Sequence, residues 1–326
     1  MYGYDIFYEQ QMELLINAVR EKRNPHSYIF EGETGMGKSV CAELLAAAIT
    51  CQESLCPCGS CKSCLMAKAK THPDIKHVVP EKDKKTIGVN VMRVINEDTL
   101  IKPFYSTKKV YIIDGDLLTV EAQNAFLKTL EEPPLYANFI ILVSDSSKLL
   151  QTVISRCALI SFSGVTNQRM KKYLEDKFSS QCDSMKFYIN YAEGNPGRLH
   201  KLIESPEFSI LRDECYKAVL SILSNEYYDA FQVSDMFDKR NDEIEDVLET
   251  LLLFLRDVLL IQEGQNLSVI NSDYVEKLRK LASYADEAKV MKAIECISLC
   301  AEMNKRNIGA KYIGMYLSLK VKEEEN

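Results

Sequence analysis

Residues 32–39, GETGMGKS, fit the phosphate-loop pattern G-x-x-x-x-G-K-[ST] and constrain the fold more than any other segment. An apolar stretch, residues 27–30, precedes the loop, and an Ala/Leu-rich helical segment, residues 38–50, begins inside it. In this order, the loop N–H groups and the helix N-terminus both face bound phosphates. We expect a nucleotide-binding α/β domain; the alternative is a glycine-rich turn with an unrelated lysine.

The residue types of the loop suit Mg²⁺-nucleotide binding. Glycines allow the backbone to curl, Lys38 reaches the β- and γ-phosphates, and the Ser39 hydroxyl holds Mg²⁺. Asp114 ends an apolar strand, residues 110–113, where a carboxylate helps to hold the same ion. The residues expected to bind ATP or ADP are Gly32, Thr34, Gly35, Gly37, Lys38, Ser39 and Asp114.

The residue after Asp114 bears on hydrolysis. A hydrolytic site of this kind normally has a glutamate there to orient the attacking water, but this chain has Gly115. Asp116 follows, with a shorter side chain that need not reach the same point. We therefore expect weak or no ATP hydrolysis by this chain alone, while nucleotide binding stays possible.

Buried apolar strands alternate with helical segments in the first half of the chain, which predicts a parallel sheet covered on both faces. The expected strands are residues 27–30, 110–113, 138–143 and 158–162, and the expected helices include residues 38–50 and 120–131. After residue 165 the pattern is helical, with a long amphipathic segment at residues 242–262. We place domain boundaries near residues 165 and 206.

Five of the 11 cysteines lie within residues 51–64. Two overlapping C-x-x-C turns let successive thiolates converge on one ion, and clustered cysteines in a reducing cytosol favour a metal over disulfides. An iron–sulfur cluster is disfavoured because Lys68 stands where that motif has its fourth cysteine. The fourth ligand is expected to be Cys51, with Cys56 as competitor. The expected ligands of a structural Zn²⁺ are Cys51, Cys58, Cys61 and Cys64.

The net charge is −7, whereas a protein that holds nucleic acid alone usually has a basic surface. We expect any contact with DNA to occur inside a larger assembly. The longest purely apolar run, residues 251–255, is too short to cross a membrane, and no secretion signal is visible. A cytoplasmic protein without a membrane partner is expected.

Five further segments complete an ordered series: residues 25–30 (PHSYIF), 71–74 (THPD), 123–134 (QNAFLKTLEEPP), 155–157 (SRC) and 194–198 (GNPGR). Together with the phosphate loop and the cysteine-rich segment 51–64, here called the cysteine knuckle, the series resembles the delta-prime family of bacterial DNA polymerase III clamp-loader subunits. The resemblance is strong over residues 1–200 and loose beyond them. Its specific parts are the LKTLEEPP run and a knuckle inside a phosphate-loop domain.

The resemblance implies an AAA+ architecture: a RecA-like domain at residues 1–165, a helical lid at 166–206 and an all-α collar at 207–326. It implies that Arg156 is an arginine finger acting in trans, and that Arg198 is a sensor arginine at the nucleotide. It implies a stator-like subunit that helps to load the sliding clamp onto primed DNA. The implied partners are the gamma/tau and delta subunits, and indirectly the clamp and primer-template DNA.

Several alternatives remain open from the residues alone. Arg156 can be an ordinary surface arginine, and Arg198 can face water instead of phosphate. A gamma/tau motor subunit is disfavoured by Gly115 and by the lack of a long C-terminal extension; a P-loop kinase or a structural adaptor without nucleotide are further possibilities. Apolar positions of the last segment fit either an oligomer contact or an internal core: Phe254, Ile294, Ile297 and Leu317.

Overall fold

The computed structural model describes residues 7–82, 84–177, 182–204, 206–224, 229–265 and 269–323. It contains two compact units. The first comprises Met1–Tyr173 with Gly194–Gly197, and the second comprises Leu174–Glu193 with Arg198–Asn326. The three-part division expected at residues 165 and 206 stays a prediction, and Ser205 at the second boundary lies outside the described residues.

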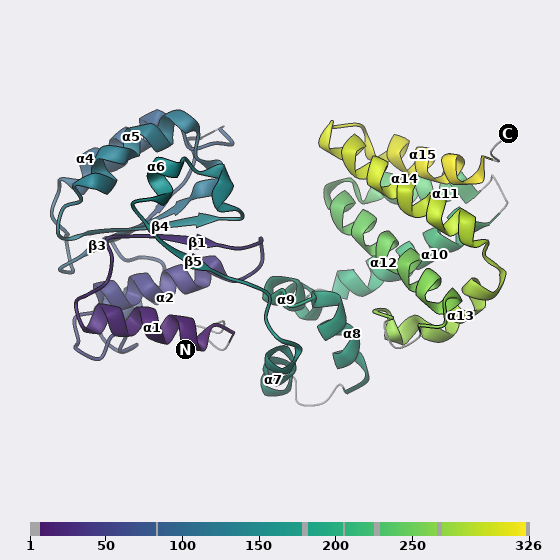
Figure 1. Ribbon diagram of the computed structural model, residues 1–326, viewed down its shortest axis with the longest axis horizontal. Coiled ribbons are helices and arrows are strands. Elements are labelled where there is room, and N and C mark those ends of the chain that lie inside the picture. Colours follow the sequence, from purple (N-terminus) through teal and green to yellow (C-terminus); the bar gives the residue numbers. More distant parts are fainter. Residues whose placement is uncertain are drawn as a thin grey trace. The chain divides into compact units, whose positions relative to one another are not determined.

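The first unit is built on a five-stranded parallel sheet with strand order β2-β3-β4-β1-β5 (Figure 1). This confirms the expected α/β fold. The strands are β1 (Ser27–Glu31), β2 (Ile75–Val78), β3 (Lys109–Asp114), β4 (Ala137–Val143) and β5 (Ala158–Ser161). The sequence did not indicate β2, a short edge strand, and β5 ends one residue earlier than expected.

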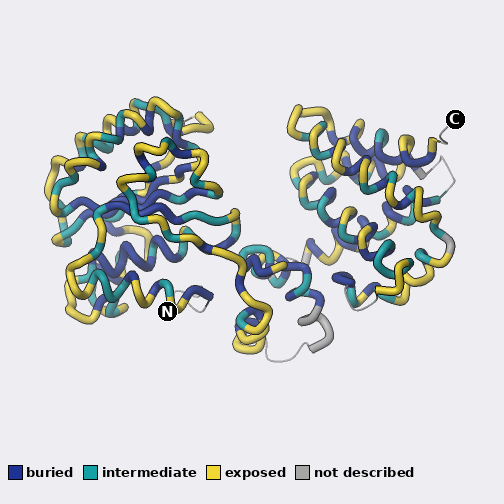
Figure 2. The backbone as a smooth tube through the Cα atoms, in the orientation of Figure 1, coloured by how far each residue is buried: buried dark blue, intermediate teal, exposed yellow. Residues whose placement is uncertain are grey.

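Helices cover both faces of this sheet (Figure 1). One layer holds α1 (Glu9–Arg20), α2 (Lys38–Thr50) and the short α3 (Lys62–Lys68); the other holds α4 (Val89–Thr99), α5 (Val120–Glu131) and α6 (Gln151–Ile154). The central strands are the most buried part of the unit (Figure 2), with Ile29, Tyr111 and Phe139 fully buried. Strands covered on both faces need continuous apolar runs, which explains the sequence pattern.

After β5 the described chain is helical. Helix α7 (Asn167–Lys177) crosses the boundary between the units. The helices that follow are α8 (Cys182–Ala192), α9 (Pro196–Glu204), α10 (Pro206–Leu223), α11 (Asp229–Lys239), α12 (Ile244–Gln262), α13 (Val275–Tyr284), α14 (Glu287–Lys305) and α15 (Ala310–Lys322). None of the helices in the described part of the chain has the length and apolar character that a bilayer-spanning segment needs.

The second unit has its own apolar core. Phe254, Ile297 and Leu317 are buried inside it, and Ile294 packs against it. Phe254, Ile297 and Leu317 therefore serve the core of one chain, while an oligomer contact formed by the segment 207–326 stays a prediction.

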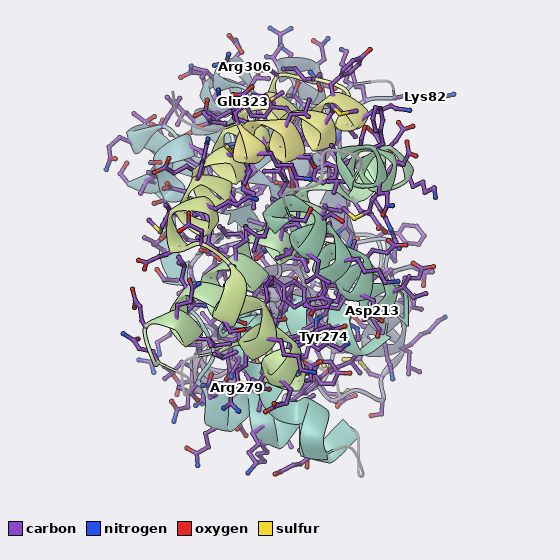
Figure 3. All side chains as sticks on the ribbon, turned by 90° about the vertical axis from the view of Figure 1, so that its right-hand side faces the viewer. Lys82, Asp213, Tyr274, Arg279, Arg306 and Glu323 are labelled. Carbon is purple, nitrogen blue, oxygen red and sulfur yellow. The ribbon has the colours of Figure 1, made fainter. Side chains whose placement is uncertain are left out.

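A buried arginine also organises this core. The guanidinium of Arg212 lies 3.5 Å from the ring centroid of Phe187 and forms two hydrogen bonds of 2.8 Å to Asp273. The ring of Tyr274 packs 4.8 Å from the same group, and its hydroxyl donates to Asp213 (Figure 3).

Candidate nucleotide site and cysteine cluster

A cavity of about 310 Å³ opens at the carboxyl edge of the sheet, a size within the range of small-molecule sites. Crevices at this edge are the usual ligand sites of open α/β sheets. The lining residues are Thr34, Gly35, Gly37, Lys38, Ser39, Val40, Asp114, Asp116, Leu142 and Gly197. The structure thus brings most of the expected nucleotide contacts to one place.

The phosphate loop is held in a curled conformation that requires glycine. Gly35 and Gly37 have φ angles of +91° and +83°. A Cβ atom on Gly35 would lie 2.5 Å from Oδ1 of Asn195, so no side chain fits there. The Asn195 amide donates to the carbonyl of Thr34 at 2.9 Å, and the N–H of Gly197 donates to the carbonyl of Gly35 at 2.8 Å.

Asn195 also caps helix α9. Its Oδ1 accepts from the N–H of Gly197 at 3.0 Å, and Pro196 is the first helical residue. The second role of Asn195, at the phosphate loop, was not foreseen, because the partner Thr34 lies 161 residues away in sequence.

Lys38 turns back onto the loop that carries it. Its ammonium donates to the carbonyl of Gly32 and, at 3.0 Å, to the carbonyl of Glu33. Burial lowers the pKa of the Lys38 ammonium, and the negative charges of Asp116 and Asp114 oppose that effect. An anionic ligand would further stabilise the charged form of this half-buried lysine.

The other side of the cavity carries two carboxylates. Burial raises the pKa of Asp114, while the backbone N–H of Asp116 donates to its Oδ1 at 3.1 Å. A cation such as Mg²⁺ would stabilise the ionised form of Asp114. Both oxygens of Asp116 accept hydrogen bonds: Oδ1 from the Ser144 hydroxyl (2.8 Å) and Lys148 (2.9 Å), and Oδ2 from the Ser144 N–H (2.9 Å). Asp116 therefore binds Ser144, which directly follows β4, and Lys148 of η2 (Ser146–Lys148).

Gly115 leaves no room for a side chain. A Cβ atom there would overlap Cγ1 of Val143 and come within 2.7 Å of Cγ2 of Ile141. Apolar side chains of β4 thus fill the space that the side chain of a water-orienting glutamate at residue 115 would need. The structure would have to shift there to accommodate a glutamate.

Arg156 is separated from the chain's own phosphate loop by the sheet. It stands two residues before β5, whereas the loop follows the carboxyl end of the parallel neighbour β1. Arg156 is paired with Glu131 at the end of α5, at 2.6 Å, and its side chain is one-third exposed. It therefore lies at the opposite edge of the sheet from this chain's own phosphate loop, and the expected role in trans stays a prediction.

Arg198 belongs to the second unit. There its guanidinium lies 2.9 Å from a carboxylate oxygen of Glu249 and 3.9 Å from one of Glu193. Gly197, the preceding residue, lines the cavity. The sensor role expected for Arg198 stays a prediction.

Four thiols gather where helices α2 and α3 meet. The sulfur atoms of Cys51, Cys58, Cys61 and Cys64 all lie within 4.8 Å of one another. Cys51 and Cys61, and likewise Cys58 and Cys64, have their sulfurs 3.9 Å apart. A tetrahedral Zn²⁺ with Zn–S bonds of about 2.3 Å places its sulfurs about 3.8 Å apart, so the four thiols fit such an ion. The competitor Cys56 does not belong to this group.

Backbone N–H groups point at these sulfurs, as expected of a metal site. The N–H groups of Cys61 and Cys64 lie 3.3 and 3.4 Å from the sulfurs of Cys58 and Cys61. Hydrogen bonds from the backbone N–H groups of Cys61 and Ser60 lower the pKa of Cys58 to about 6, which favours its thiolate, whereas burial raises the pKa of Cys51 and Cys64.

The THPD segment ties the knuckle to the sheet. His72 Nδ1 accepts from the N–H of Asp74 at 3.0 Å, so its Nε2 carries the proton and donates to the Ser63 hydroxyl at 2.9 Å. Ser63 in turn donates to the carbonyl of Thr50 at 2.8 Å. The fully buried Asp74 carboxylate accepts backbone N–H groups of the loop before β3, those of Phe104, Tyr105 and Ser106, at 2.6–2.7 Å.

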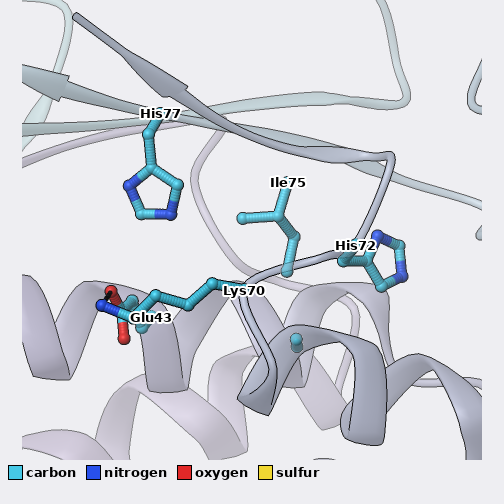
Figure 4. A pocket seen from close by; sticks show the side chains of 6 residues that line it. Glu43, Lys70, His72, Ile75 and His77 are labelled. Carbon is cyan, nitrogen blue, oxygen red and sulfur yellow. Dashed lines mark ion pairs between the residues drawn. The ribbon is translucent and has the colours of Figure 1, made fainter.

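A small pocket beside this segment holds at most one water molecule, with about 10 Å³ of free volume (Figure 4). The ion pair between Lys70 and Glu43, at 2.8 Å, stands at its side. The pocket is too small for a second ligand.

Two family models match this chain. The model described as DNA polymerase III, delta subunit, matches residues 8–166. The model described as DNA polymerase III, delta subunit, C terminal, matches residues 206–310. Together they span both units.

Similar proteins agree with this match. DNA polymerase III subunit delta' of Bacillus subtilis is 29% identical over 96% of this chain and 95% of its own length. The delta' subunit of Escherichia coli is 29% identical over 66% of each chain, and the B. subtilis tau subunit is 30% identical over 79% of this chain but 50% of its own. A gamma subunit-related protein of Thermotoga maritima shares the fold, with a TM-score of 0.53 and 19% identity over 96% of this chain and 98% of its own. The chain therefore belongs to the delta-prime family of DNA polymerase III subunits.

Proposed function

We propose that this chain is the delta-prime subunit of a cytoplasmic clamp loader, which places the sliding clamp onto primed DNA during replication. The observation that carries this proposal is the likeness to the B. subtilis delta' subunit along nearly the whole of both chains. Its partners would be the gamma/tau and delta subunits, with the clamp and primer-template DNA as indirect partners.

In this role the phosphate loop binds ATP or ADP without fast hydrolysis. Lys38, Ser39 and the loop N–H groups would hold the phosphates, and Asp114 would hold Mg²⁺ with Ser39. The bound ion would supply charge neutralisation between the β- and γ-phosphates. The packing around Gly115 supports a site that binds nucleotide without hydrolysing it, because no carboxylate side chain fits at residue 115 to orient the attacking water.

Arg156 would act on the nucleotide of a neighbouring subunit. A guanidinium is always charged and offers forked donors to phosphate oxygens, and an arginine supplied in trans stabilises charge on the transferring phosphoryl group. The location of Arg156 away from the chain's own phosphate loop supports the proposal that it acts on a neighbouring subunit. The subunit is then a stator that activates its neighbour.

The cysteine cluster would hold one structural Zn²⁺. Four sulfur ligands complete the tetrahedron and leave no open position for a reacting water. The ion would join the end of α2 to the start of α3, which stabilises the knuckle beside the sheet.

Co-purification with gamma/tau and delta subunits of the same cell, followed by mass measurement of the intact complex, tests the proposed assembly. One copy of this chain in a complex with both partners is the expected result. A chain that stays monomeric in their presence would show that it is not a clamp-loader subunit. Binding of fluorescent ATP, weakened at least about tenfold by Lys38→Ala, tests the nucleotide site separately and excludes a pure adaptor.

A further inference from the structure

A second lysine, Lys148, is paired with Asp116, one of the residues that line the phosphate cavity. Lys148 ends η2, just after β4, and its Nζ lies 2.9 Å from Oδ1 of Asp116 and 2.7 Å from the Ser144 hydroxyl. The Ser144 hydroxyl donates to the same Asp116 oxygen at 2.8 Å. The three side chains form a closed triangle in which the hydroxyl accepts from the ammonium and donates to the carboxylate.

This triangle shares one residue, Asp116, with the lining of the cavity that Lys38 also lines. Asp116 lines the cavity, and its N–H donates to Asp114, the expected Mg²⁺ ligand. Lys38, by contrast, is bound to the carbonyls of its own loop. The two lysines therefore approach the cavity from different elements.

The ammonium of Lys148 can donate one more hydrogen bond. An ammonium has three donors, and the triangle uses two of them. The side chain is 53% exposed, so the third donor is accessible without breaking either existing bond. The triangle fixes the position of the cation, so little conformational freedom is lost when it binds an anion.

In phosphate loops of this kind, backbone N–H groups hold the α- and β-phosphates and the lysine reaches the β- and γ-phosphates; Ser39 and Asp114 would hold Mg²⁺, which would neutralise part of their charge. The γ-phosphate then lies on the side of Asp114 and Asp116. It adds negative charge close to two carboxylates, which is unfavourable unless a cation is present. Lys148 contributes a positive charge here, because its ammonium lies 2.9 Å from Oδ1 of Asp116.

We infer that Lys148 is a specificity-determining residue, which favours a nucleoside triphosphate over a diphosphate by donating to the γ-phosphate; this rests on the nucleotide binding proposed above. Ser144 and Asp116 position its ammonium. The ligand is a Mg²⁺-nucleoside triphosphate that is held intact, so bound ATP would persist while the neighbouring subunit turns over.

Calorimetric titration of the full chain with Mg²⁺-ATP and Mg²⁺-ADP tests this role. Lys148→Met should weaken ATP binding about tenfold, which corresponds to about 1.4 kcal/mol, and ADP binding less than twofold. Lys148→Arg keeps the charge and should retain most of the preference. Asp116→Asn removes a negative charge beside the γ-phosphate and should raise the ratio of ATP to ADP affinity. Lys70→Met, which removes an exposed lysine paired with Glu43 outside the cavity, is the matched control and should change neither affinity.

An unchanged ratio of ATP to ADP affinity in Lys148→Met would overturn the inference, as would equal weakening of both nucleotides. If Lys38→Ala abolishes binding while Lys148→Met has no selective effect, only the role of Lys148 fails. If the unaltered chain binds neither nucleotide, the proposed nucleotide site fails and the role of Lys148 fails with it.

Discussion

Nη2 of Arg156 lies 2.6 Å from Oε1 of Glu131, so the SRC segment and the LKTLEEPP run meet in space. A second guanidinium nitrogen, Nη1, donates to the carbonyl of Thr152 at 2.8 Å and to the Ser155 hydroxyl at 3.1 Å. The pair with Glu131 is partly exposed on both sides, with side chains 34% and 50% accessible. An incoming phosphate group could replace the carboxylate at little cost, because exposed ion pairs are weak.

Glu131→Gln tests how strongly this pair holds Arg156. An exposed ion pair contributes about 0–1 kcal/mol, so the free energy of unfolding should change by no more than that. ATPase activity of a reconstituted complex should be kept or increased, because the arginine loses a competing partner. Chemical denaturation and steady-state ATPase assays measure the two effects. A loss of activity as large as that of Arg156→Ala would mean that Glu131 is needed to aim the arginine.

Metal analysis of the purified protein should give about one zinc per chain. Cys61→Ser should abolish binding, since a structural site needs all four ligands, and Cys51→Ser should do the same. Cys56→Ser is the matched control, because Cys56 is a nearby cysteine outside the cluster, and it should retain the metal. Iron with visible absorbance, or zinc lost from Cys56→Ser but kept by Cys51→Ser, would contradict the ligand set.

Asp74→Asn should destabilise the first unit by about 3 kcal/mol at pH 7, because a neutral amide replaces a buried carboxylate that accepts several N–H groups. Burial alone would raise the pKa of Asp74, but the N–H groups of Ser106, Phe104 and Tyr105 outweigh it and lower the pKa below its ordinary 3.8.

The low pKa of Asp74 gives this effect a pH dependence. The folded state binds the proton less readily than the unfolded chain, so the stabilisation is complete above pH 3.8 and is lost as the pH falls through the folded pKa. The difference between the native protein and Asp74→Asn should therefore shrink below that pH. A difference independent of pH between 2 and 7 would show that the charge is not the cause.

Gly115→Ala should reduce the free energy of unfolding by about 1–3 kcal/mol, as overpacking of a filled core does. Gly115→Glu should be less stable still and should not create ATPase activity, because Val143 and Ile141 occupy the space. The measurements are thermal unfolding and phosphate release by the isolated chain. A stable Gly115→Glu variant with brisk ATPase activity would refute the view that packing excludes hydrolysis.

Most helices and strands of the first unit could be predicted from the sequence, because short local patterns define them. Helices α2 and α5 have the expected bounds, set by the glycine loop before one and by Pro133-Pro134 after the other. Strand β2 was missed because its middle residues, Lys76 and His77, are polar, and a four-residue edge strand leaves no periodic pattern. Long-range contacts such as Asn195 with Thr34 leave no local trace at all.

The candidate sites show the same contrast. The cysteine spacing indicated three ligands and left Cys51 and Cys56 as candidates for the fourth; the fold brings the expected Cys51 to 3.9 Å from Cys61, ten residues away in sequence. The Asp116–Ser144–Lys148 triangle joins two strand ends that the sequence does not relate. In the second unit, apolar spacing is the same for a core and for an interface, and only burial assigned Phe254 to the core.

ATP hydrolysis by a reconstituted complex that carries Arg156→Ala is the most direct measurement of whether this subunit activates a neighbour. The complex should assemble normally, and turnover at the neighbouring nucleotide site should fall about a thousandfold, with little recovery in Arg156→Lys. Arg23→Ala, which removes another exposed arginine paired with a glutamate, should leave turnover unchanged. Full turnover in the Arg156→Ala complex would contradict the proposed role. Arg156 would then be an ordinary surface arginine that forms an ion pair with Glu131.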